Sequence, residues 1–442
     1  MVQPTRPSLA ARVRCCALAA ATAVGCGNSA QAAHPAEGGS RAVDAATAPL
    51  DAAAADSASP TPDAGAAPLD SGTEASANDA TLDGGGGDGE ADAGGDAGDA
   101  GEDASDACAS ATVSPPTLDC TGLYADLATK NLAPGVRPYQ PAVVLWSDGA
   151  QKARFIQLPP GTQIDATDPT EWRFPVGTKV WKEFSKNGHR VETRLFQKVD
   201  DGPPPIWVHA TYAWNADESA AVASGGGDIT LEDDGGSYHI PTFSECDQCH
   251  NGRTDHVLGF EQVALGLAGA QGLTLPELVA EGLIAPAPAQ TSLALGDDGT
   301  GAAAPAVAWL HINCGVTCHN ANSNATAYGV GMRLRLDPAY LDGRALTPAE
   351  FDTLRTTLGV PAVSPGWVAP VHWTRIVPGD SNGSLLAQLI SHRGKNNPAG
   401  GQMPPIATSI VDTADVANVV AWIDKMPGAD AGADADAGAP GD

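Results

Sequence analysis

Residues 206–214 read IWVHATYAW, and every second residue from Ile206 to Trp214 is apolar or aromatic. Side chains of a strand alternate between its two faces, so one face of this segment can pack against a core. Four earlier runs are rich in Val, Ile, Phe, Trp and Thr, at residues 142–146, 154–158, 178–184 and 190–199. Asn187-Gly188 lies between the last two runs and favours a tight hairpin. Because no helical pattern separates the runs, we expect an antiparallel, sandwich-like or small-barrel domain.

Two segments have a composition that does not support a folded core. Residues 28–106 and 428–442 are almost entirely Ala, Asp, Gly, Ser and Pro, and contain no Trp, Tyr or Phe. Such segments bury too little apolar surface to offset chain entropy, so we expect disordered acidic tails. They hold much of the acidity behind the formal net charge of −29. No basic patch stands out, which argues against nucleic acid as a partner.

The N-terminus has the features of an export signal. Three arginines precede a short apolar run at residues 15–24, which is too short to span a bilayer. Residues 1–25 are therefore expected to be a signal peptide. Ala23-Val24-Gly25-Cys26 resembles a bacterial lipobox, and this resemblance implies acylation of Cys26 and a membrane contact through the lipid. Asn28 favours the outer membrane, facing the periplasm or the cell surface, over the inner membrane; an ordinary soluble secreted protein is the alternative.

The nine cysteines fall into groups with different expected fates. Cys15 and Cys16 leave with the signal peptide, and Cys26 takes the lipid. Cys108 and Cys120 have no histidine nearby, and an oxidising compartment favours a short-loop disulfide between them. The other four cysteines form two pairs, each followed directly by a histidine.

Cys246-Asp247-Gln248-Cys249-His250 is a C-x-x-C-H motif, which predicts covalent haem attachment. Two thiols one short turn apart can each add to one vinyl group of the porphyrin. The adjacent imidazole then lies beneath the ring, where it can bind iron. A disulfide between the two cysteines or half of a zinc site are the alternatives.

Residues 314–319 form a similar motif with one additional residue between its cysteines. Cys314, Cys318 and His319 are the expected ligands of a second haem c. The wider spacing changes how the thiols meet the vinyl groups. The alternative is a disulfide in a region that has lost its haem.

Flanking segments bear on the sixth iron ligands. A short helix is expected at 305–312, with Trp309 in a core, and a final helix at 413–425, capped by Asp412. Helix, motif, the loop Gln402-Met403-Pro404-Pro405 and final helix occur in the order of the class I cytochrome c fold. That resemblance implies Met403 as the sixth ligand of the second haem; a core-filling role is the alternative. For the first haem the choice falls on His256, ahead of other candidates, namely His239, His311, Met332 and His372.

Ordered motifs over about residues 143–423 are similar to those of an exported bacterial family of diheme c-type cytochromes. The motifs are Leu145-Trp146-Ser147-Asp148-Gly149-Ala150, Phe155-Ile156-Gln157-Leu158-Pro159-Pro160-Gly161, Phe174-Pro175-Val176-Gly177-Thr178, Thr193-Arg194-Leu195, Tyr212-Ala213-Trp214-Asn215, Ile240-Pro241, the first haem motif, Leu258-Gly259-Phe260, Asn313-Cys314, Val377-Pro378-Gly379-Asp380 and Met403-Pro404-Pro405. The resemblance implies an α+β multidomain chain, in which a β domain precedes two cytochrome-like segments with one haem each. The widened second motif departs from the family pattern. The expected parts are 1–25 (signal peptide), 26–107 (lipidated cysteine and linker), 108–240 (β-rich domain), 241–300 (first haem segment), 301–427 (mainly α, class I cytochrome c-like) and 428–442 (disordered tail).

These features favour an electron carrier over a catalyst. Iron in haem c would cycle between Fe(III) and Fe(II), while the protein supplies axial ligands and burial. A diheme peroxidase-like oxidoreductase is an alternative, as is a haem-free surface binding module whose cysteine pairs are disulfides. The sequence does not identify the redox partner protein.

Overall fold

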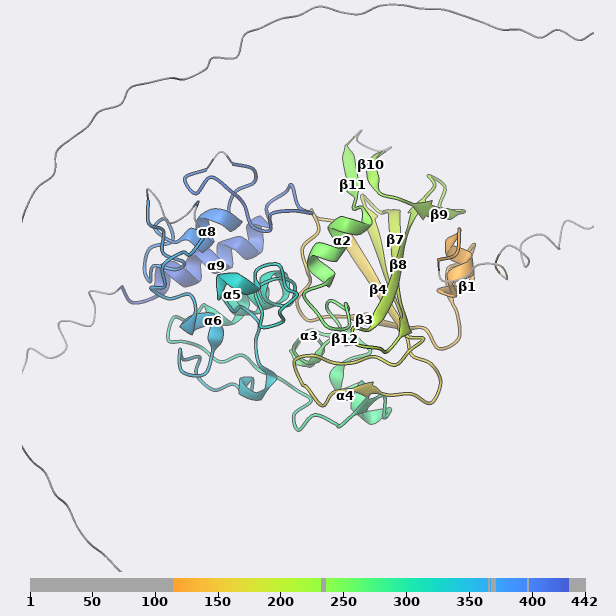
Figure 1. Cartoon of the computed structure of the whole chain (residues 1–442), viewed down its shortest axis with the longest axis horizontal. Helices are drawn as coiled ribbons and strands as arrows, with labels where there is room; N and C mark the ends of the chain where they lie inside the picture. Colours follow the sequence, from red (N-terminus) through yellow and green to blue (C-terminus); the bar gives the residue numbers. More distant parts are fainter. Residues whose placement is uncertain are drawn as a thin grey trace, which may run out of the picture. The chain divides into compact units, whose positions relative to one another are not determined.

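The computed structural model describes Cys108 and residues 114–231, 236–364, 366, 371–395 and 397–428, which all belong to one compact unit, Gly94–Asp442 (Figure 1). The expected signal peptide, the expected lipidation site Cys26, the expected linker before Cys108 and the tail after Gly428 lie outside the described residues. Within these ranges, no helix combines the length and apolar character needed to cross a membrane.

A seven-stranded antiparallel sheet dominates the first half of the described chain, and its order is β12-β3-β4-β6-β7-β8-β9. Its strands are β3 (Arg137–Gln140), β4 (Gln151–Gln157), β6 (Lys179–Lys186), β7 (His189–Asp200), β8 (Ile206–Trp214), β9 (Ala221–Ser224) and β12 (Gln271–Gly272). The hairpin between β6 and β7 turns through Asn187 and Gly188, both with positive φ, as the sequence predicts. The antiparallel sheet and the α+β class are therefore confirmed.

Residues 142–146 form no strand, so that prediction is wrong. Their backbone bonds to distant parts of the chain instead of to a neighbouring strand. The Ala142 amide donates to the Ala264 carbonyl at 2.8 Å, and the Trp146 amide donates to the Asn313 side chain at 2.7 Å. Val143 and Leu145 of this run pack against a buried cluster that contains Leu258 and Val316, so the run joins the motif region instead of the sheet.

The two faces of the sheet pack against different parts of the chain. Trp181 packs in a cluster with Leu118, ahead of the sheet, whereas the adjacent Val180 packs in a cluster with Phe260 and Leu275, which follow the first motif. Adjacent strand residues point to opposite faces, so this division follows from the alternation along β6. The segment after the first motif therefore covers one face of the sheet.

Shorter pairings tie other segments to this core. β12 belongs to the segment expected at 241–300, so this segment is part of the main sheet through its pairing with β3. Three two-stranded sheets complete the set: β1 (Tyr124–Asp126) with β2 (Asn131–Leu132), β10 (Gly227–Thr230) with β11 (Ser237–Ile240), and β13 (Ile284–Ala285) in parallel with β5 (Ile164–Asp165). The predicted disulfide between Cys108 and Cys120 is present, with the two Cα atoms 5.1 Å apart.

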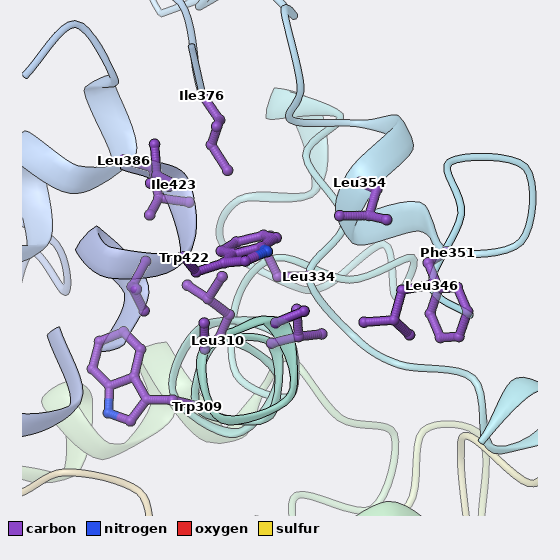
Figure 2. Close-up of a cluster of buried hydrophobic side chains, with 14 of the residues drawn as sticks. Trp309, Leu310, Leu334, Leu346, Phe351, Leu354, Ile376, Leu386, Trp422 and Ile423 are labelled. Carbon is purple, nitrogen blue, oxygen red and sulfur yellow. The ribbon is translucent and has the colours of Figure 1, made fainter. Parts of the chain in front are cut away.

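Helices predominate from residue 243 onwards, and one short helical turn at Leu118–Thr121 precedes the sheet. They are α2 (Phe243–His250), α3 (Gln262–Gly266), α4 (Leu275–Ala280), α5 (Ala303–Leu310), α6 (Asp352–Arg355), α8 (Leu385–Ile390) and α9 (Thr413–Lys425), with the single turns η1 (Leu118–Thr121), η2 (His311–Gly315), η3 (Tyr328–Val330) and η4 (Pro338–Tyr340). Trp309 of α5 and Trp422 of α9 lie in one buried cluster with Leu310 and Leu334 (Figure 2).

Asp412 caps α9 and also holds α5. Its carboxylate accepts hydrogen bonds from the Asp415 amide at 3.3 Å and from Trp309 Nε1 at 3.0 Å. Asp412→Ala should lower the free energy of unfolding by about 2 kcal/mol, because a cap is lost and a buried indole N–H loses its acceptor. Urea denaturation would measure this change, and an unchanged midpoint would show that neither bond matters for stability.

Candidate cofactor site

One cavity of about 560 Å³ brings both cysteine–histidine motifs together. Met403 also lines this cavity. The motif residues in its lining are Cys246, Cys249, His250, Cys314, Cys318 and His319. Residues from α2, from the turns after α5 and from the loop before α9 thus meet in one place.

The first motif lies on α2, which begins with a capping box between Thr242 and Glu245. Cys246 and Cys249 are three residues apart, so they share one face of this helix. The helix lies against the sheet (Figure 1), where the Phe196 ring stacks on the His250 ring with 4.1 Å between centroids and an angle of 14°. The capped helix and the stacked ring fix both the backbone and the imidazole of the motif.

The His250 imidazole is oriented for ligation. Its Nδ1 atom donates to the His256 carbonyl at 2.5 Å, and this bond leaves Nε2 as the free nitrogen. Burial, reinforced by the charge of Lys182, holds the pKa of His250 well below its usual range. A neutral imidazole whose other nitrogen is anchored to a backbone carbonyl is the usual state of a metal-ligating histidine.

The second motif follows α5 through wide turns. The Val316 amide bonds to the His311 carbonyl at 2.8 Å, and the His319 amide bonds to the Cys314 carbonyl at 2.8 Å. Both bonds span five residues, which is the spacing of a π-type turn. A π-type turn accommodates one more residue than an α turn. The additional residue between Cys314 and Cys318 is therefore absorbed locally.

His319 is also buried, at 8% exposure. Burial lowers its pKa to about 4, with a further contribution from Arg375 and Arg333 and an opposing one from the Met332 carbonyl. Within the described ranges, its Nδ1 atom has no hydrogen-bond partner. This imidazole is neutral like that of His250, and the Met332 carbonyl is the backbone acceptor beside it.

The two motifs contact each other directly. Gly252 packs so closely on Thr317 that a Cβ atom at Gly252 would lie 1.7 Å from the Thr317 carbonyl oxygen. The Asn320 side chain donates to the Gly252 carbonyl at 3.3 Å and to the Gly315 carbonyl at 2.9 Å. The Thr326 hydroxyl donates to the Gln248 carbonyl at 3.0 Å. The motifs form one backbone-packed unit rather than two independent sites.

All four motif cysteines are free thiols, so neither pair forms the alternative disulfide. The Cys249 thiol donates to the Cys318 sulfur, which lowers the pKa of Cys318 to about 7. Burial raises the pKa of Cys246, and raises that of Cys314 to about 12. Most of the thiols are thus protonated at neutral pH.

The donor atoms of the two motifs are not arranged as a four-ligand metal site. Among the described residues, the single cluster of three or more such donors within 4.8 Å is Cys108, Asp119 and Cys120. Two of these are joined in the disulfide and have no thiolate to offer. The geometry gives no support to the zinc alternative at the motifs.

The expected sixth ligands have different positions. Met403 lines the cavity that the two motifs share, and its amide donates to the Leu389 carbonyl at 2.9 Å. His256 is absent from the lining of that cavity and lines a second one, of about 580 Å³, beside Arg253. The carbonyl of His256, not its ring, meets the first motif. The structure therefore does not bring the His256 imidazole to the cysteines.

The other histidine candidates are held elsewhere or by other groups. His311 lies between Glu261, whose carboxylate is 3.2 Å from Nε2, and the Leu336 amide, which donates to Nδ1 at 3.0 Å. His239 lines the cavity that the two motifs share, but its ring is paired with Asp228 and Glu245. His372 is exposed, and Met332 packs against the helical core.

Glu261 is a positioning residue that the sequence reasoning missed. It caps α3 through bonds from the Val263 and Ala264 amides and also contacts His311, where the second motif region begins. An acid before a short apolar run is a recognisable cap signal, but its histidine partner lies fifty residues further on and has no local signature. One buried carboxylate thus links the segment that follows the first motif to the segment that precedes the second.

Glu261 should also make stability depend on pH. Burial alone would raise its pKa, but the hydrogen bond from His311 and nearby Arg253 lower it to about 2, from an ordinary value of 4.5. A depressed carboxyl pKa contributes stability above pH 4.5, and this contribution is lost as the pH falls towards 2. Wild type should therefore lose about 2 kcal/mol more between pH 5 and pH 3 than Glu261→Gln does.

Urea denaturation at pH 5, 4 and 3 would measure that difference. Glu281→Gln, at an exposed ion pair with Arg137, is the control and should behave as wild type. Parallel acid profiles for wild type and Glu261→Gln would exclude this role.

Comparison of the chain with family models, curated proteins and solved structures finds no match.

Proposed function

We propose that this protein is an exported c-type cytochrome that attaches haem covalently at two motifs and transfers single electrons. The observation that carries the proposal is the state of His250. Its imidazole is buried and neutral, it is anchored through Nδ1 to the His256 carbonyl, and it lines a cavity with two free thiols. These are the groups that covalent haem attachment requires.

The residues around the cavity fit a porphyrin. Each thiol would give its sulfur to one vinyl carbon and its hydrogen to the other, so attachment consumes no oxidant. His250 and His319 would each hold iron through one imidazole nitrogen. When bound, haem supplies the one-electron Fe(III)/Fe(II) couple. The chain contributes orientation, through the Phe196 stack and the His256 carbonyl, and exclusion of water through burial.

Met403 is our proposed sixth ligand at the second site. It lines the same cavity as His319, and it is partly buried against two hydrophobic clusters. A thioether ligand raises the reduction potential relative to a second histidine. The packing of Gly252 on Thr317 supports transfer between the two haems, because it places their attachment segments side by side.

A peroxidase-like oxidoreductase is the second candidate, and the position of His256 favours it. Without a sixth ligand from the chain, a haem held by His250 would offer an open coordination position. Carbon monoxide added to the reduced protein would bind an open position and shift the Soret band. An unchanged spectrum would favour pure electron transfer.

Finer points of architecture and location belong to the same proposal. We infer a sandwich-like β domain and a class I cytochrome c-like helical region, with membership of the diheme family. The order of α5, the second motif, the Met403 loop and α9 supports the class I cytochrome c-like region. We also propose that the chain is anchored by a lipid at Cys26 and lies at the outer membrane.

The test is the number of covalent haems. The full chain would be expressed with cytochrome c maturation machinery and examined by pyridine haemochrome spectrum and intact mass. We expect two haems in wild type and one in the double variant Cys246→Ala/Cys249→Ala. Colourless wild-type protein would refute the proposal.

A further inference from the structure

Five cationic side chains of the sheet line the cofactor cavity. They are Lys152 and Arg154 of β4, Lys182 and Lys186 of β6, and Arg194 of β7. The strand register sets three of them in a row, because Arg154 pairs with Lys182 and Lys182 pairs with Arg194. Residues paired across antiparallel strands share a face, so these charges lie next to one another. In a chain of net charge −29 this concentration of positive charge needs an explanation.

Of these side chains, only Arg194 has a carboxylate partner in the part of the chain that the structure describes. It pairs with Glu192, which is fully buried and also accepts a hydrogen bond from the Tyr238 hydroxyl at 2.7 Å. Arg154 donates to the Gln140 side chain at 2.8 Å and Lys152 to the Leu145 carbonyl, and both acceptors are neutral.

The side chain of Lys182 has neither a hydrogen bond nor an ion pair to any described residue. Burial and the neighbouring Arg154 and Arg194 lower its pKa to about 7, while the nearby Cys246 and Cys249 act in the opposite direction. Its amine therefore lies near the first motif, among like charges.

The other ionised groups of the cavity do not neutralise this cluster. The Asp148 carboxylate accepts bonds from residues 408–410, and Asp228 and Glu245 are paired with His239. Lys186 and Arg393 donate to backbone carbonyl groups. Among the described residues, the three clustered basic groups thus face the cavity without an anion, and burial lowers the pKa of all three, that of Lys152 well below its usual range. Buried charges of one sign are costly unless an opposite charge joins them.

We propose that Lys152, Arg154 and Lys182 receive the carboxylates of the first haem, namely its two propionates. The inference rests on the proposed function and adds the groups that select and tune the cofactor. The propionates are the acidic groups of the porphyrin, and charge-assisted hydrogen bonds from lysine and arginine suit carboxylates. The same cations stabilise the reduced haem, since reduction adds one negative charge, and so they raise its reduction potential.

The test uses Lys182→Met in the full chain, matured under limiting haem supply. Haem-peptide mass mapping would give the occupancy of each motif separately, with the second motif as an internal reference. We expect the occupancy of the first motif to fall roughly tenfold, as for the loss of a hydrogen bond to a charged group. We also expect a tenfold shift of the redox equilibrium of the remaining haem towards Fe(III), which is ~59 mV for one electron.

Two further variants keep the result interpretable. Lys182→Arg conserves the charge and should retain the occupancy and potential of wild type. Lys179→Met removes a lysine of the same strand from the opposite face, where it donates to the Thr121 carbonyl. It should leave both haem measurements unchanged. Because the Lys182 side chain makes no hydrogen bond, its loss should not prevent folding. Lys152→Met removes a second basic side chain of the same cluster.

The outcomes separate the two ideas. Wild type without any covalent haem would overturn the function and this inference together. Haem in wild type, with unchanged occupancy and potential in both Lys182→Met and Lys152→Met, would overturn the inference alone. The holoprotein would also be titrated with inorganic phosphate. A saturable Soret change in wild type that is absent from Lys182→Met, at equal occupancy, would assign the cluster to a soluble anion and overturn the propionate assignment.

Discussion

Gly252→Ala should force the two haem motifs apart. The added Cβ would lie 1.7 Å from the Thr317 carbonyl oxygen and 2.8 Å from its carbon. Both are backbone atoms, so no side chain can rotate to make room. We expect a loss of about 3 kcal/mol or more in the free energy of unfolding, at the upper end of the cost of overpacking. Denaturant unfolding of the full chain would measure it.

Gly329→Ala is a matched control for this substitution. A Cβ at Gly329 would meet nothing within 4 Å, and its φ is not positive. This variant should unfold as wild type does. Since the motifs share one cavity, Gly252→Ala should also reduce covalent haem at both of them. Unchanged stability and haem content in Gly252→Ala would mean that the motifs do not pack together as described.

Cys318→Ala should remove one complete haem from the mature protein. The second motif needs both of its thiols for two thioether bonds, and Cys318 lines the cavity beside His319. The mass of the mature chain should fall by one haem, and the haemochrome absorbance should fall to half. One haem in both wild type and Cys318→Ala would show that the widened motif carries no haem, and the protein would then be a single-haem cytochrome.

The comparison variant is Cys120→Ala, which breaks the disulfide with Cys108 outside the cavity. It should leave the number of haems at two, even if it lowers stability. Loss of haem in both variants would indicate a general folding defect rather than the removal of an attachment thiol.

The sequence predicted those parts of the fold that depend on local pattern. Alternation from Ile206 to Trp214 identifies β8, and Asn187-Gly188 identifies the hairpin between β6 and β7, because strand face and turn chemistry are set within a few residues. The run at 142–146 shows the limit. It has strand-like residues, but its partners come from segments more than a hundred residues away.

The candidate site shows the same division. The cysteines and motif histidines could be read from spacing, and so could Met403 from the order of elements. His256 was chosen because it is close in sequence, yet the turn after α2 brings its carbonyl rather than its ring to His250. The row of Arg154, Lys182 and Arg194 could not be foreseen, since the register of three strands creates it.

The π-type turns after α5 have a consequence for how this chain tolerates changes in length. An inserted residue in an α-helix would rotate every later side chain by about 100°. Here, bonds from Val316 back to His311 and from His319 back to Cys314 take up the inserted residue within a single stretch. A motif with one additional residue between its cysteines is therefore compatible with an unchanged register in the segments on either side of it.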